Sequence, residues 1–67
     1  MKHVDAREVR LSLKLTQAEF CSRFGIDLAS LRSWEQGRHP PSGSARVLLM
    51  VIASAPEAVE QAVAHAS

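Results

Sequence analysis

The chain has 67 residues, with eight Lys and Arg, seven Asp and Glu and one Cys, and its formal net charge is +1 at pH 7. This length allows one domain, expected over residues 1–67, whose small core leaves stability marginal unless a second copy buries more apolar surface. A single Cys excludes an internal disulfide and suits a reducing cytoplasm, and neither a membrane span nor a secretory signal is visible.

The charge is distributed unevenly along the chain. Residues 1–46 carry all eight basic residues and five acidic ones, a net charge of +3, whereas residues 47–67 carry two acidic residues and no Lys or Arg. A basic amino-terminal part is compatible with a nucleic-acid partner, although +3 is modest by itself. We find no metal-ligand spacing, nucleophile–base pair or glycine-rich phosphate loop, so we expect no metal, no cofactor and no enzymatic activity.

The first predicted helix runs from Ala6 to about Leu13. Asp5 and Glu8 form a typical helix start, because a capping side chain and an acidic first turn both satisfy the exposed N–H groups. Val9 and Leu13 lie about one turn apart, which predicts that they share the inward face of this helix.

Residues 16–37 are predicted to form a helix-turn-helix. Thr16 and Glu19 fit a capping box at the start of its first helix. Gly25 stands where that helix must end, because a left-handed residue there carries no Cβ penalty. Asp27 is placed to cap the second helix, and Gly37 is placed to end it. Two short helices joined by a turn that contains Gly are typical of this motif.

The periodicity of the motif separates an inner from an outer face. The apolar residues with inward spacing are Phe20, Phe24, Ile26, Leu31 and Trp34. In a helix-turn-helix the outer face of the second helix enters the major groove of DNA. Here that face consists of Leu28, Ala29, Arg32, Ser33 and Gln36.

A further helix is predicted over residues 43–54, after a loop that contains two prolines. One of its apolar faces completes the core around Trp34. Its second apolar strip, which includes Val47 and Val51, would be exposed on an isolated small domain. We therefore expect this strip to contact a second copy of the chain.

The last predicted helix covers residues 56–65 and begins at Pro56, a residue suited to the first helical position. Its apolar stripe includes Val59, Ala62 and Val63. Such a stripe is usually a core face, but four preceding helices already supply a core. We expect the stripe to serve partly in a twofold dimer. The chain is thus predicted to be all-α, a compact bundle of about five short helices around the helix-turn-helix.

The run TQAEF, followed by Gly25 and then WEQG, resembles the Cro and phage-repressor (Xre-type) family of helix-turn-helix proteins. The resemblance extends over roughly Val9 to Val63 and implies the lambda-repressor-like DNA-binding fold. Within this family, the run LRSWEQGRHPPSGSARVLL from Leu31 to Leu49 is similar to the antitoxins of HigA-type toxin–antitoxin modules.

The implied function is regulation of transcription by a homodimer bound to a palindromic operator in double-stranded DNA. In the antitoxin branch this serves autorepression, and the same molecule neutralises a partner ribonuclease toxin. Two alternatives stay open. In the first, the chain is a protein-binding module directed only at such a toxin. In the second, it is a phage-type repressor unrelated to any toxin.

The resemblance also implies roles for individual side chains. Gln17 matches the family's Gln that clamps the DNA backbone, and the alternative is an exposed Gln at a helix start. Arg10 and Glu35 match an Arg and a Glu that pair across the domain. The alternative for them is two solvated charges, worth ~0–1 kcal/mol.

The family's base-facing positions correspond to Asp27, Leu28, Ala29 and Ser33, with Arg32 one turn further along. The amide side chains with which phage repressors read adenine are missing here. Leu28 and Ala29 can contact thymine methyl groups, and Arg32 can grip either a guanine or a phosphate. Asp27 fits a cap better than a base contact, because a carboxylate opposes binding near phosphates. Further phosphate contacts are expected from Gln36, Arg38, His39 and Arg46.

Overall fold

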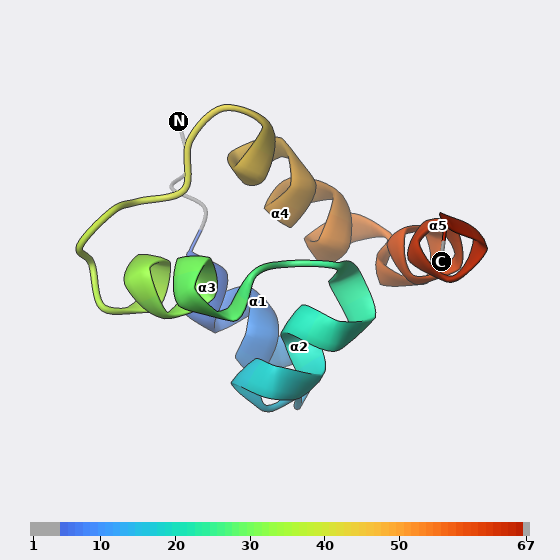
Figure 1. The fold of residues 1–67 in the computed structure, drawn as a ribbon, viewed down its shortest axis with the longest axis horizontal. Coiled ribbons are helices and arrows are strands. Elements are labelled where there is room, and N and C mark those ends of the chain that lie inside the picture. Colours follow the sequence, from blue (N-terminus) through green and yellow to red (C-terminus); the bar gives the residue numbers. More distant parts are fainter. Residues whose placement is uncertain (1–4, 67) are drawn as a thin grey trace.

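The computed structural model describes residues 5–66, and these form five α-helices without a strand (Figure 1). The helices are α1 (Ala6–Ser12), α2 (Gln17–Phe24), α3 (Leu28–Glu35), α4 (Ser44–Ser54) and α5 (Pro56–Ala66). The predicted all-α bundle is confirmed, and α2 and α3 are the two helices of the helix-turn-helix. No single helix within the described range is long and apolar enough to cross a membrane.

The starts of the motif helices are determined by side-chain caps. Thr16 Oγ1 accepts from the Glu19 N–H at 3.1 Å, and Glu19 Oε1 accepts from the Thr16 N–H at 2.9 Å. Asp27 Oδ2 accepts from the Ser30 N–H at 3.1 Å. The predicted capping box and the predicted Asp27 cap are therefore both confirmed, and each satisfies N–H groups that a helix start leaves without a partner.

The ends of the motif helices depend on left-handed glycines. Gly25 has a φ of 68°, and its N–H donates to Cys21 O. Gly37 has a φ of 77°, and its N–H donates to Trp34 O at 3.2 Å. Helix α3 ends at Glu35 and has Gln36 as its C-cap, so Gly37 is the first residue after the cap, where a left-handed glycine commonly ends a helix.

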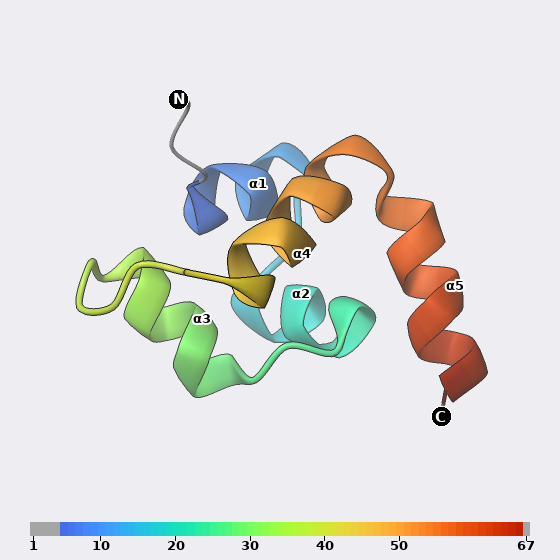
Figure 2. The ribbon, with the colours of Figure 1, turned by 90° about the horizontal axis from the view of Figure 1, so that it is seen from above.

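The core is formed by side chains from all five helices. Phe20 and Phe24 on α2 have ring centroids 4.9 Å apart, and they pack with Leu31 of α3. Among residues 5–66 the buried set is Ala6, Phe20, Cys21, Phe24, Leu31, Leu49, Ile52 and Val59. Trp34 and Ile26, also predicted inward, lie half-buried at its edge. Figure 2 shows α4 lying across the middle, between α3 on one side and α5 on the other.

The packing of α5 corrects one expectation. The helix makes an angle of 117° with α4 and packs against both α4 and α2. Val59 is only 9% exposed and belongs to the core, and Val63 is half-buried, with its side chain facing Gly25. The Val59 side chain, expected on a dimer surface, is thus already covered within its own chain. Of the predicted stripe, Ala62 remains exposed.

The turn between α1 and α2 contains a left-handed residue that is not glycine. Lys14 has a φ of 59°, and its N–H donates to Leu11 O at 3.0 Å. The Leu15 N–H donates to Arg10 O at 3.4 Å, which completes a Schellman motif around Lys14. Most helices that end in this way have Gly at this position, because a Cβ in the left-handed region is strained.

We expect Lys14→Gly to stabilise the domain by about 0.5–1 kcal/mol, because the left-handed Cβ penalty exceeds the entropic cost of glycine. Thermal unfolding followed by circular dichroism should show a Tm a few degrees higher. Lys14→Ala keeps the Cβ and serves as the control, so its Tm should stay near that of the parent. An equal gain in both variants would trace the effect to the lysine charge and not to the backbone.

Candidate nucleic-acid interface

The outer face of α3 is narrower than its helical spacing predicts. Ala29, Arg32 and Gln36 are exposed and lie about one turn apart along the helix. Leu28 is half-buried because its side chain packs against the core, and Ser33 is half-buried as well. The exposed part of the predicted base-reading face therefore centres on Ala29 and Arg32.

Asp27 is engaged at the start of α3. Its Oδ2 accepts from the Ser30 N–H at 3.1 Å and from the Ser30 hydroxyl at 3.4 Å. These bonds hold the carboxylate against the first turn, so the structure supports the role of a cap for this residue.

The basic residues near α3 are exposed. Arg32 and Arg38 form no ion pair with any other residue between positions 5 and 66. Arg38 follows directly after the left-handed glycine that ends α3, and His39 is exposed next to it. Arg46 is exposed in the first turn of α4. Arg23 differs, because its Nη1 lies 3.5 Å from Glu60 Oε1 on α5.

An ion pair connects α1 with the end of α3. Arg10 Nε donates to Glu35 Oε2 at 2.7 Å, and Arg10 Nη2 donates to Glu35 Oε1 at 2.8 Å. The third donor of the guanidinium, Nη1, reaches Leu15 O at 3.0 Å. The two side chains are only 12% and 7% exposed. The pair predicted from the family resemblance is confirmed, and its bidentate geometry is the strong form of this interaction.

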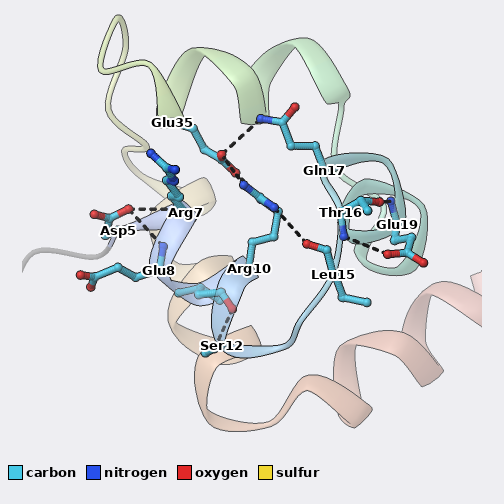
Figure 3. A network of polar contacts seen from close by, with 11 residues as sticks. Asp5, Arg7, Glu8, Arg10, Ser12, Leu15, Thr16, Gln17, Glu19 and Glu35 are labelled. Carbon is cyan, nitrogen blue, oxygen red and sulfur yellow. Dashed lines mark hydrogen bonds and ion pairs between the residues drawn. The ribbon is translucent and has the colours of Figure 1, made fainter.

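Gln17 joins this network from α2. Its Nε2 donates to Glu35 Oε1 at 3.2 Å, so one carboxylate oxygen accepts from both Gln17 and Arg10 (Figure 3). The hydrogen bonds from Arg10 are the main reason that the pKa of Glu35 lies below its usual value, and the Gln17 bond lowers the pKa further, while burial opposes both. Sequence reasoning missed this bond, because no local pattern relates residues 17 and 35.

An apolar strip lies on α4. Val47 is 58% exposed, Met50 51% and Val51 40%. Leu11 on the neighbouring helix α1 is 52% exposed, and it was not among the residues expected from the sequence. The predicted positions Val47 and Val51 are thus on the surface of the chain.

Comparison with known proteins agrees with this geometry. The sequence model described as "Helix-turn-helix" matches residues 7–45, which cover α1 from its second residue, α2, α3 and the first two residues of α4. A crystal structure described as an HTH XRE-family like protein from Agrobacterium tumefaciens is similar, with 47% sequence identity and a TM-score of 0.81. The similarity covers 85% of this chain and 92% of that chain. No curated protein matches the sequence.

Proposed function

This chain belongs to the Xre-type helix-turn-helix family of DNA-binding transcription regulators, and from that membership we propose that it is a sequence-specific repressor with α3 in the major groove. The observation that carries the proposal is the exposed face of α3. Ala29 and Arg32 are exposed there, Arg32 forms no ion pair with another residue in the range 5–66, and the Arg10–Glu35 pair holds the helix in position.

The contacts divide into positioning and reading. Gln17 at the α2 amino terminus and Arg38 after α3 are assigned to phosphates, which determine register and not sequence. Gln36, His39 and Arg46 are assigned to the flanking phosphates in the same way. Ala29 is assigned to a thymine methyl group and Arg32 to a guanine or a phosphate, while the half-buried Leu28 and Ser33 are secondary readers.

The dimer is proposed to form through the exposed strip of α4. Val47 and Val51 lie there, and the exposed Ala62 is the part of the α5 stripe that can still add to the contact. A domain this small gains stability from covering the strip. Twofold pairing also doubles a small number of phosphate contacts, which is why a palindromic operator suits this chain.

The regulated operon is proposed to be a toxin–antitoxin module. This assignment is supported by the similarity of residues 31–49 to HigA-type antitoxins. The alternatives are a module that only neutralises a ribonuclease toxin and a phage-type repressor with no toxin. A small ribonuclease encoded beside the gene, and its copurification with this protein, would favour a toxin partner.

Footprinting on the DNA upstream of the chain's own gene tests the proposal, at two salt concentrations. We expect Gln17→Ala to weaken binding by about 10-fold or more at all sequences, because it removes one hydrogen bond to a charged phosphate. Arg32→Ala should lower discrimination by ~1–3 kcal/mol if Arg32 reads guanine. If it contacts a phosphate, discrimination stays and the salt slope falls by about 0.9.

Arg23→Ala is the matched control for the arginine variant. It also removes one positive charge, but from the side of α2 that faces Glu60 on α5. Its affinity for DNA should stay close to that of the parent protein. If Gln17→Ala and Arg32→Ala behave like this control, α3 does not occupy the groove and the assignment is wrong.

A further inference from the structure

We propose that Glu35 is a positioning residue for DNA contact: its carboxylate orients the Gln17 amide so that one N–H of that amide faces a DNA phosphate. The inference rests on the proposed function and adds a role for a residue that does not itself touch DNA. The central observation is the bond from Gln17 Nε2 to Glu35 Oε1, at 3.2 Å between side chains on α2 and α3 (Figure 3).

The chemistry of the amide explains how one bond can orient it. A Gln side chain has two N–H donors on Nε2 and one acceptor oxygen. A carboxylate only accepts, so Glu35 favours the rotamer that turns the NH₂ group toward it and disfavours the flipped one. The first N–H of Gln17 is then bound, and the second is a donor with a defined direction. A freely rotating amide would also present its oxygen to a phosphate, where the two would repel.

The Arg10 guanidinium makes this carboxylate suitable as an anchor. Its bidentate bonds at 2.7 Å and 2.8 Å prevent rotation of the carboxylate, and the bond to Leu15 O holds the guanidinium next to the start of α2. Arg10 also neutralises a negative charge that would otherwise repel DNA close to the proposed contact. Glu35 is therefore able to serve a DNA contact although it is acidic.

The arrangement connects the two kinds of DNA contact. Arg10 belongs to α1, Gln17 to α2 and Glu35 to the last turn of α3, whose exposed face carries Arg32. The network thereby sets the position of the phosphate donor relative to the face that reads bases. If the Gln17 amide were displaced, α3 could enter the groove only by losing the contact between Gln17 and the DNA phosphate.

The first test observes the Gln17 side-chain amide by ¹H–¹⁵N NMR of the unmodified protein during a pH titration. We expect its NH₂ resonances to move with the protonation of Glu35, at a pH below the usual carboxyl range. The charged or titratable groups that bear on Glu35 are Arg7 and Arg10 from α1 and Cys21 from α2. Glu19 of α2 lies two positions from Gln17, and its bonds to Thr16 also lower its pKa. Glu19→Gln, which keeps a side chain suited to the capping box, is therefore titrated in parallel and should leave the Gln17 response unchanged. The exposed Gln36 amide is the internal control and should not follow this titration. A Gln17 amide that behaves like Gln36 would overturn the inference without any use of DNA.

The second test is a double-mutant cycle on the affinity for an operator fragment. Glu35→Gln should weaken binding about 5–10-fold when Gln17 is present, and less than about 2-fold when Gln17 is replaced by Ala. A purely structural role would give the same loss in both backgrounds, which would overturn the inference. Circular dichroism at the assay temperature establishes whether each variant is folded. If one is not, the NMR titration of the unmodified protein tests the inference in its place.

Glu8→Gln is the charge control for this cycle. It removes one carboxylate from an exposed position on α1, and fewer negative charges should leave DNA binding unchanged or slightly tighter. If Glu35→Gln binds DNA more weakly, the loss of its negative charge therefore cannot be the reason. If the parent protein binds no DNA sequence at all, the proposed function fails, whereas the titration still reports on the Gln17–Glu35 bond.

Discussion

Arg10→Met should lower the free energy of unfolding by about 2–3 kcal/mol, because it leaves a part-buried carboxylate without its charged partner. Glu35 is 7% exposed at its side chain, and both of its oxygens accept from Arg10. The variant also removes the donor to Leu15 O. For a domain of this size such a loss approaches the whole stability, and urea unfolding should show it as a much lower midpoint.

The double variant Arg10→Met/Glu35→Leu separates pairing from packing. It removes both charges, so no unpaired carboxylate is left in this part-buried position, and most of the lost stability should return. If the single and double variants cost the same, the two residues are not coupled. Arg23→Met is the matched control, because its partner Glu60 is 35% exposed and the pair is solvated. It should cost less than about 1 kcal/mol.

The same pair predicts a pH dependence with a defined sign. Because Arg10 lowers the pKa of folded Glu35, the unfolded chain binds a proton at this site more readily than the folded one. The stabilisation is complete above the ordinary carboxyl pKa of about 4.3 and is lost as pH falls through the lower folded pKa. Arg10→Met should therefore differ most from the parent near neutral pH, and the difference should shrink below about pH 4.

Val59→Asp should unfold the domain at room temperature, whereas Val51→Asp should leave it folded and monomeric. Val59 is 9% exposed within the core, where an unpaired carboxylate costs several kcal/mol, comparable with the whole stability. Val51 is 40% exposed on the proposed dimer strip, so a carboxylate there remains hydrated when the chain is alone.

Circular dichroism and sedimentation measure the two outcomes separately. A folded Val59→Asp protein would contradict the packing of α5, and an unchanged dimer in Val51→Asp would refute the α4 interface. Ala53→Asp is a matched control for the second variant, because Ala53 is exposed on the same helix outside the proposed strip. It should stay folded and keep the association state of the parent.

The sequence by itself determined the features that depend on neighbouring residues. The Thr16–Glu19 capping box and the Asp27 cap join residues three positions apart, so residue types and spacing are sufficient to predict them. Gly25 ends α2 because the requirement for a left-handed residue is local to one position. Helical periodicity similarly identified Phe20 and Leu31 as core residues.

Only the tertiary structure decided which face of each helix is buried and which is exposed. Periodicity places Leu28 and Ala29 side by side on α3, but the crossing of helices covers the first and exposes the second. Val59 is a core residue because α5 folds back onto α2 and α4, a direction that its own sequence does not encode. The bond between Gln17 and Glu35 spans 18 positions and depends on the angle between two helices. Contacts between distant residues follow from the packing of whole elements, and for this reason local chemistry could not predict them.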